Sequence, residues 1–269
     1  MSVRPKKSLG QHFLADPEAV RRIVAAVQAP SGAPVVEIGP GEGALTGALM
    51  ARYPHLVALE VDREAIAHLR RRFPALDVRE QDVLTADWSR LDTEAGGSSP
   101  KSAAPNSRLH VVGNLPYYIT SPIVFALLDA RAHLARAVVM VQKEVAERMV
   151  APHGSKTYGT LSVYLGLYAR AQLLFDVGPE AFRPPPKVES AVVAIEFSGV
   201  AEPEVAFSAL QRVVRAAFGQ RRKMLRNSLK PLVSETRREI PEWAATLRPE
   251  QVAPRDFVRL AHHFLSPAT

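Results

Sequence analysis

Short apolar runs alternate with helical periodicities along the first half of the chain. The runs are bounded by Gly, Pro, Asn and Asp, which is typical of buried strands, and they span 33–38, 55–60, 76–80 and 109–113. The segments between them predict helices. In the first helix, Asp16 is a cap, Pro17 takes the first turn, and apolar residues recur at Val20, Ile23, Val24 and Val27. This alternation predicts an α/β fold with a parallel, doubly wound sheet.

The second half of the chain predicts three more strands and then helices alone. The strands span 137–141, 172–177 and 188–197, and the last two are expected to close one edge of the sheet as an antiparallel hairpin. Helical patterns follow at 205–218, 221–229 and 254–265. We therefore expect two domains, 1–198 and a small helical domain 199–269. Residues 93–107 are rich in Gly, Ser, Ala and Pro, which predicts a flexible surface insertion.

Composition narrows the protein class. The 269 residues are 47% hydrophobic and include no cysteine, so a sizeable core is possible while disulfides and thiolate metal sites are not. The sequence suggests no metal site of another kind. No run of about eighteen apolar residues is present, and the basic start lacks the apolar segment of a secretory signal. We expect a cytoplasmic protein that contacts no membrane and, as the default, is a monomer.

Positive charge is concentrated in one stretch. The net charge is +7, and seven cations without any acid stand between 212 and 230, so the rest of the chain is balanced. They are Arg212, Arg215, Arg221, Arg222, Lys223, Arg226 and Lys230. Such a run is often a solvated helix face. Its density without compensating acids favours a surface that binds nucleic-acid phosphates. Arg4, Lys6 and Lys7 could add a second contact.

The segment Asn114-Leu115-Pro116-Tyr117 follows an apolar run, at a strand end where open α/β sheets bind ligands. An amide, a proline-fixed backbone and an aromatic ring form a site for a flat ring that carries an amino group, such as adenine. Adenine's exocyclic nitrogen is a poor nucleophile because its lone pair is delocalised into the ring. The Asn114 side-chain oxygen and the Leu115 carbonyl could hold its two protons and turn the lone pair outward. Pro116 would fix the aim of that carbonyl, and Tyr117 would stack on the base. No general base is required.

A donor site is predicted at the preceding strand ends. The glycine-rich loop 39–43 lacks both the dinucleotide fingerprint and the Lys-Ser/Thr pair of a phosphate loop. Glu60 ends the second strand, where a carboxylate can accept from both ribose hydroxyls, and Asp82 follows the third, where it can accept from an adenine amino group. Each acid alone would be read as a helix cap or a solvated turn residue. Together they describe a site for adenosine.

These motifs resemble those of class I S-adenosylmethionine-dependent methyltransferases, and more closely the ribosomal RNA adenine dimethyltransferases. The matching segments are 8–14, 39–43, Glu60, Asp82, 114–117, 182–188 and 220–229. The resemblance implies a Rossmann-like seven-stranded methyltransferase sheet with S-adenosylmethionine as cofactor. It implies that His12 and Leu14 lie over this cofactor. It also implies that Gly39, with Gly41 in the same loop, contacts the methionine, Glu60 the ribose, Asp82 the adenine and Asn114 the region near the sulfonium. The family often has Asn where this chain has His12.

The resemblance also implies the substrate. It places Phe182 on the face of the flipped adenine opposite Tyr117; from the residues alone, Phe182 is equally well a core residue. The family dimethylates N6 of two adjacent adenosines in a hairpin loop near the 3′ end of 16S rRNA, in a small ribosomal subunit particle. The second-domain motif looks more like this branch than like its large-subunit sister, which confers antibiotic resistance.

Two alternatives compete with this interpretation. DNA adenine enzymes generally carry an acidic residue where Asn114 stands, which disfavours a DNA substrate. The second alternative is a ribosome-assembly or nucleic-acid-binding factor with a vestigial cofactor site. The presence of Glu60, Asp82 and Asn114 argues against lost activity, although both roles could coexist.

Overall fold

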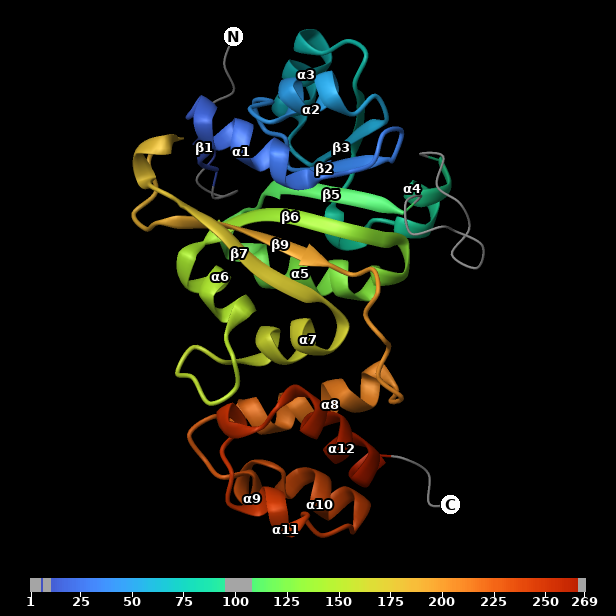
Figure 1. The fold of residues 1–269 in the computed structure, drawn as a ribbon, viewed down its shortest axis with the longest axis vertical. Coiled ribbons are helices and arrows are strands. Elements are labelled where there is room, and N and C mark those ends of the chain that lie inside the picture. Colours follow the sequence, from blue (N-terminus) through green and yellow to red (C-terminus); the bar gives the residue numbers. More distant parts are fainter. Residues whose placement is uncertain (1–5, 7–10, 95–107, 266–269) are drawn as a thin grey trace. The chain divides into compact units, whose positions relative to one another are not determined.

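A mixed sheet of seven strands, in the order β4-β3-β2-β5-β6-β9-β7, is the centre of the first part of the chain (Figure 1). The computed structural model describes residue 6 and residues 11–94 and 108–265. The strands are β2 (Val35–Ile38), β3 (Leu56–Glu60), β4 (Asp77–Glu80), β5 (Leu109–Asn114), β6 (Leu134–Gln142), β7 (Arg170–Val177) and β9 (Ser190–Glu196). Neighbours from β4 to β6 are parallel, and β9 is antiparallel to β6. The predicted parallel sheet is confirmed, with β9 and β7 at one edge.

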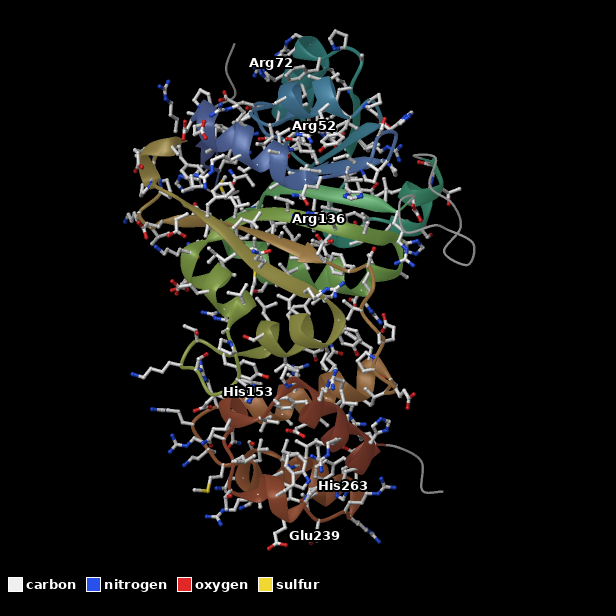
Figure 2. All side chains as sticks on the ribbon, in the orientation of Figure 1. Arg52, Arg72, Arg136, His153, Glu239 and His263 are labelled. Carbon is white, nitrogen blue, oxygen red and sulfur yellow. The ribbon has the colours of Figure 1, made fainter. Side chains whose placement is uncertain are left out.

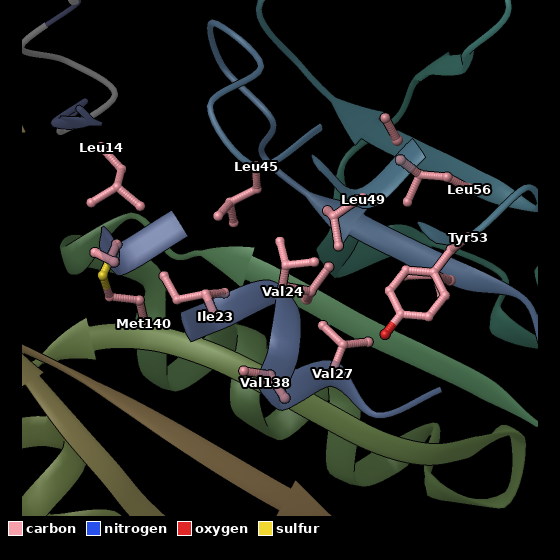
Figure 3. Packing of buried hydrophobic residues seen from close by; sticks show 14 of the residues in the cluster. Leu14, Ile23, Val24, Val27, Leu45, Leu49, Tyr53, Leu56, Val138 and Met140 are labelled. Carbon is pink, nitrogen blue, oxygen red and sulfur yellow. The ribbon is translucent and has the colours of Figure 1, made fainter. Parts of the chain in front are cut away.

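Helices on both faces cover this sheet. They are α1 (Pro17–Val27), α2 (Thr46–Arg52), α3 (Arg63–Arg72), α4 (Trp88–Glu94), α5 (Thr120–Asp129) and α6 (Lys143–Val150). The α1 and α5 helices lie on opposite faces (Figures 1 and 3). The predicted start of α1 is confirmed, because the Asp16 carboxylate accepts from the amides of Glu18 and Ala19 and Pro17 takes the first helical position.

The core on the α1 face follows from the spacing of apolar residues in that helix. Ile23, Val24 and Val27 recur on one side of α1 and are buried. They belong to one cluster with α2 and β6 (Figure 3), to which Leu49, Tyr53, Val138 and Met140 contribute. Burying each large aliphatic side chain contributes about 1.5–3 kcal/mol, so this cluster fixes the helices over the sheet.

The chain divides into two compact units at positions that differ in part from the predicted domains. The first unit comprises Met1–Ala146 and Ala171–Ser198, and the second Glu147–Arg170 and Gly199–Thr269. The predicted boundary after residue 198 agrees with this division. Residues 147–170, however, belong with the helical unit, because α7 (Thr160–Tyr168) packs against the C-terminal helices and the Tyr158 hydroxyl donates to the Val252 carbonyl at 3.0 Å.

The helical unit is built around three helices. Contacts join α7 to α8 (Phe207–Gly219) and to α12 (Pro254–Leu265), and α8 to α12. Shorter helices complete it: α9 (Leu225–Ser228), α10 (Lys230–Thr236) and α11 (Glu242–Ala245). The predicted helix 221–229 is therefore shorter than expected, since residues 220–224 form a turn before α9.

Two further points concern connections. A small antiparallel pair, β1 (Phe13–Leu14) with β8 (Phe182–Arg183), joins distant parts of the chain. Of the predicted insertion 93–107, Thr93 and Glu94 end α4, and the remainder lies outside the described residues. Among the helices that the structure describes, none is long and apolar enough to cross a membrane.

The space around two glycines, Gly113 in β5 and Gly47 in α2, predicts different effects when each is replaced by alanine. A Cβ at Gly113 would lie 2.7 Å from the Ile38 carbonyl oxygen, whereas at Gly47, inside α2, it would make ordinary contact with the Phe73 ring at 3.4 Å. We expect Gly113→Ala to destabilise the protein by about 1–3 kcal/mol. We expect Gly47→Ala to be neutral or to stabilise it by about 0.5–1 kcal/mol. Urea unfolding of both variants checks this, and equal stability of the two would contradict it.

Candidate functional site

Glu60 is buried at the end of β3, where its carboxylate holds the glycine-rich loop. Oε1 accepts from the amides of Val61 and Asp62 at 2.9 and 3.0 Å, and Oε2 accepts from the Gly41 amide at 3.1 Å. A carboxylate offers about four acceptor positions, so one stays open, on Oε2. The carboxylate is therefore fixed in place. In this conformation it has room for one further donor rather than for the two ribose hydroxyls expected.

Gly41 is required by a close approach of two segments. Its φ is +58°, and a Cβ there would lie 2.8 Å from Cε1 of the Phe13 ring. Glycine adopts this left-handed conformation without a steric penalty. The loop can therefore turn beneath the β1 strand, and its Gly41 amide reaches Glu60.

One pocket contains most of the predicted site residues. Its floor is apolar and comes from the ends of neighbouring strands and from α5, with Ile38, Leu59, Val83 and Ile123. Polar groups surround this floor, and they include His12, Glu60, Asp82 and Asn114. Gly39, Gly41, Leu115, Pro116 and Tyr117 also line it. Tyr118, which the sequence did not single out, lines the same pocket with 59% of its surface exposed.

Asp82 combines a capping role with a free oxygen. Its Oδ1 accepts from the Leu84 amide at 2.9 Å and so caps the short 3-10 helix Val83–Thr85. No described residue donates to its Oδ2. The expectation of a cap and that of a ligand contact are therefore compatible at this exposed residue.

Asn114 ends β5 with its side-chain amide in one fixed orientation. Nδ2 donates to the His12 carbonyl at 2.9 Å. A carbonyl only accepts, so the amide nitrogen must face it and Oδ1 must face away. No described residue donates to Oδ1. Asn114 therefore presents an acceptor in a pocket whose other walls carry Glu60 and Asp82.

The next three residues are positioned by separate contacts. The Leu115 amide donates to the Met140 carbonyl at 3.0 Å, which ties this turn to β6. Pro116 has φ −59° and caps the 3-10 helix Tyr117–Ile119. The Tyr117 hydroxyl shares a 2.7 Å hydrogen bond with Oγ of Ser190, which is buried at the start of β9. Sequence reasoning missed Ser190, whose one signal is that it follows the proline-rich loop.

His12 contacts three residues of two other sequence motifs, 114–117 and 182–188. Its carbonyl accepts from Asn114, its ring stacks on Tyr117 with centroids 5.7 Å apart and planes 23° apart, and its Nδ1 donates to the Pro184 carbonyl at 2.8 Å. Since that carbonyl only accepts, the hydrogen is on Nδ1. One face of the Tyr117 ring is thus covered by His12, not by Phe182.

Two predicted positions differ in the structure. Phe182 is 2% exposed and packs in the core, where it pairs with Leu14 across the β1–β8 ladder. The alternative of a core residue therefore describes Phe182 in this conformation, and its contact with a flipped adenine stays a prediction. Leu14 is itself a core residue, 5% exposed, and Phe13 lines the pocket in its place. Alternation along β1 explains this, because neighbouring side chains point to opposite sides.

Comparisons with known proteins identify the family. A family model described as ribosomal RNA adenine dimethylase matches residues 3–261. The chain belongs to the ribosomal RNA adenine dimethylase family. It is 49% identical to "Ribosomal RNA small subunit methyltransferase A" of Salinibacter ruber, over 97% of this chain and 85% of that protein. It is 41% identical to the protein of the same name from Pseudomonas aeruginosa, over 96% and 94%.

Solved structures agree on the fold. A dimethyladenosine transferase from Plasmodium falciparum has a TM-score of 0.72 at 24% identity, over 93% of this chain and 96% of that one. The 23S rRNA methyltransferase ErmE has a TM-score of 0.60 at 26% identity, over 94% and 99%. The resemblance to this dimethylase family and the predicted fold class, a Rossmann-like sheet with a helical C-terminal part, are confirmed.

In this dimethylase, the N-terminal segment is fastened beside the pocket. Lys6 Nζ contacts Asp62 Oδ1 at 2.7 Å, and Gln11 Nε2 donates to Asp62 Oδ2 at 3.3 Å. Asp62 also caps α3, accepting from the Glu64 amide at 3.0 Å. Burial opposes ionisation of Asp62, but these hydrogen bonds outweigh it and hold its pKa below the ordinary value. Asp62, two residues after Glu60, thus brings Gln11 to the pocket.

The predicted basic residues lie on the helical unit, and their environments differ. Arg212 is paired with Glu235, with Nη2 2.6 and 2.5 Å from the two carboxylate oxygens. Arg221 donates from Nη2 to the Lys156 carbonyl at 2.5 Å and keeps its charge uncompensated. The others are exposed without an ion-pair partner among the described residues: Arg215, Arg222, Lys223, Arg226 and Lys230. The charge available to a ligand is therefore largest around residues 221–226.

Glu37, in β2, is a buried acid that sequence reasoning did not select. Its Oε2 accepts from the Thr46 hydroxyl at 2.7 Å. Burial raises its pKa from 4.5 to about 8; the Thr46 hydrogen bond opposes this rise, and the Glu60 charge adds to it. Glu37 is therefore mainly protonated at neutral pH, so that Glu60 carries the negative charge of this part of the site.

This raised pKa predicts how stability depends on pH. Between about pH 4.5 and 8, Glu37 is ionised in the unfolded chain and protonated in the folded one, so unfolding releases a proton and stability falls as pH rises. Glu37→Gln keeps an acceptor for Thr46 and removes this titration. We expect the stability difference, variant minus wild type, to increase from pH 5 to pH 8 in urea unfolding. A constant difference would show that Glu37 is ionised when folded.

Proposed function

We propose that this protein transfers methyl groups from S-adenosylmethionine to N6 of two adjacent adenosines in a hairpin loop near the 3′ end of 16S rRNA, giving N6,N6-dimethyladenosine. The observation that carries this proposal is the hydrogen bond from Asn114 Nδ2 to the His12 carbonyl. It leaves Oδ1 as an acceptor in the pocket that holds Glu60 and Asp82. Curated small-subunit enzymes are 41–49% identical to the chain, against 26% for the 23S enzyme, which favours the small-subunit substrate.

The residues of the pocket fit an adenosine-bearing cofactor. Glu60 has one open acceptor position for a ribose hydroxyl, and Asp82 has a free Oδ2 for the adenine amino group. Ile38, Leu59 and Val83 offer an apolar surface to the adenine ring. Gly39 and Gly41 bring backbone close to the methionine portion. The bound cofactor would supply an electrophilic methyl group on a sulfonium. The ligand role expected of Leu14 does not belong to its buried side chain.

The acceptor site works by orienting one amine. Asn114 Oδ1 and the Leu115 carbonyl accept hydrogen bonds from the two N6–H groups, which turns the nitrogen lone pair out of conjugation with the ring. Both acceptors are fixed, Asn114 by His12 and Leu115 by Met140. Fixed geometry lowers the barrier because the reactants need no further ordering. No described side chain is needed as a general base, since the methylated amine loses its proton readily.

Tyr117 holds the adenine ring through its free face. Because His12 covers the other face, the base stacks on a platform of two rings rather than between Tyr117 and Phe182. Stacking of this kind contributes about 1–3 kcal/mol per base. Ser190 fixes the ring through the Tyr117 hydroxyl. The base must be unstacked to enter, which suits an adenosine in a loop.

The helical unit binds the RNA phosphates. Arg215, Arg221, Arg222, Lys223 and Arg226 are exposed cations of this unit, and such contacts position a substrate rather than specify its sequence. Arg212 contributes less, because Glu235 compensates its charge. The proposed partner is a small ribosomal subunit particle, and the protein acts in the cytoplasm as a monomer.

One experiment tests the function as a whole. The protein is incubated with labelled S-adenosylmethionine and, separately, with small-subunit particles, large-subunit RNA and DNA, followed by nucleoside analysis. We expect N6,N6-dimethyladenosine in small-subunit rRNA alone. Label in the large-subunit RNA would favour the sister branch, and a lack of label in every sample would favour a binding factor with a vestigial cofactor site.

The acceptor role of Asn114 predicts a selective loss of catalysis. We expect Asn114→Ala to lower the rate of methyl transfer about 10²–10³-fold or more, by analogy with the loss of one fixed hydrogen bond at other reacting centres. RNA binding should stay nearly intact. Asn114→Asp is the matched control, because it keeps an acceptor oxygen but cannot donate to His12, and an intermediate rate is expected. Full turnover by Asn114→Ala would disprove the orienting mechanism.

Pairing of Arg212 with Glu235 predicts unequal effects of two arginine substitutions. Arg222→Ala should weaken RNA binding and reduce the slope of log affinity against log salt by about one, because one phosphate contact is lost. Arg212→Ala should change that slope less, although it removes the same charge. Filter-binding titrations with an rRNA hairpin between 50 and 200 mM salt would compare them. Identical slopes for Arg222→Ala and wild type would mean that this face is merely solvated.

A further inference from the structure

The loop that joins α6 to α7, residues 151–159, lies beside the basic turn of the helical unit. The Arg221 guanidinium donates to the carbonyl of Lys156, in the middle of this loop, at 2.5 Å. Both segments belong to the second compact unit. Their contact therefore brings together two parts of the chain that the sequence had placed in different domains.

This loop is rigid. The Gly154 amide donates to the Glu250 carbonyl at 2.6 Å, and Ser155 Oγ donates to the Pro152 carbonyl at 2.8 Å. Tyr158 is buried, its ring lies 6.1 Å from the Phe218 ring of α8, and its hydroxyl donates to Val252. A loop held at both its middle and its end loses little conformational entropy when it binds a ligand.

The exposed side chains of the loop carry positive charge or hydrogen-bond donors. Lys156 and Thr157 are exposed, and so is His153, which Figure 2 labels. The Lys156 ammonium has no ion-pair partner among the described residues. The stretch 148–170 contains no acid, and neither does the stretch 207–230 that carries the basic turn. Two acid-free segments therefore meet at the bond between Arg221 and Lys156.

We infer that the 151–159 loop is a second phosphate-binding segment of the helical unit, with Lys156 as its charged contact. Lys156 and the cations of the 221–226 segment form one surface that follows an RNA backbone. Arg221 has a double role, because it offers a charge and ties the loop to the turn. Lysine suits a phosphate contact as a point charge. This inference rests on the proposed function, since it takes RNA as the ligand, and it extends the binding surface beyond the residues recognised in the sequence.

The test compares single alanine variants of the full chain. The probe is a hairpin transcript of the 3′ end of small-subunit rRNA, and its affinity is measured between 50 and 200 mM salt. We expect Lys156→Ala to lower the salt slope by about one, so that the affinity lost over this range becomes about threefold smaller than for wild type. Arg71→Ala, an exposed cation on α3 of the other unit, is the matched control and should leave the slope unchanged. Thermal melts establish that each variant is folded.

Lys223→Ala separates this inference from the proposed function. If Lys223→Ala lowers the slope and Lys156→Ala does not, the loop is not part of the surface, while the RNA-binding role of the helical unit stands. If neither variant changes the slope, the helical unit does not hold RNA, and both proposals fail. If both lower it, the double variant should lower it by about two, because separate phosphate contacts release their counterions independently.

Discussion

The bond between Asn114 Nδ2 and the His12 carbonyl is the contact on which the rest of the site depends. An isolated asparagine amide could present either its oxygen or its nitrogen to a ligand. A carbonyl on one side removes that choice, because it accepts and cannot donate. The acceptor is thus selected by the backbone of a distant segment. This segment is in turn held by the β1–β8 ladder and by Lys6 and Gln11 on Asp62. In the proposed mechanism, the N-terminal residues therefore contribute by fixing the Asn114 oxygen, which they do not carry.

In the part of the pocket expected to hold the methyl donor, the charge of one carboxylate likewise depends on its neighbours. Glu60 is surrounded by backbone amides and keeps one acceptor position, while Glu37 nearby is buried and has a raised pKa. Two ionised carboxylates close together in an apolar setting would repel each other. Protonation of Glu37 removes that repulsion, and it leaves Glu60 free to accept from a ligand. The negative charge is thus at Glu60, at the end of β3, while Glu37 in the neighbouring strand β2 is buried in its protonated form.

The sequence could predict the strand-end residues because their position follows from chain order alone. Glu60 and Asn114 end parallel strands and Asp82 lies two residues after one, and parallel strands bring their carboxyl ends to one edge. Pairings between distant segments could not be predicted in this way. The burial of Phe182 could not be predicted, because a proline-rich loop gives no periodicity from which burial can be inferred. Its partner strand lies at the other end of the chain. Residues 147–170 were misplaced for the same kind of reason, since no change in composition marks the boundary inside α6.

The number of cations in a basic stretch overstates the positive charge that is available to bind phosphates. Seven cations between residues 212 and 230 account for the whole net charge, yet Arg212 is compensated by Glu235. Lys156, which lies outside this stretch, is uncompensated and is joined to it by Arg221. An exposed ion pair contributes little to stability, but it removes a charge from the field that a polyanion meets. The proposed binding surface therefore consists of the cations that lack acidic neighbours in space, and the fold determines these more than the sequence run does.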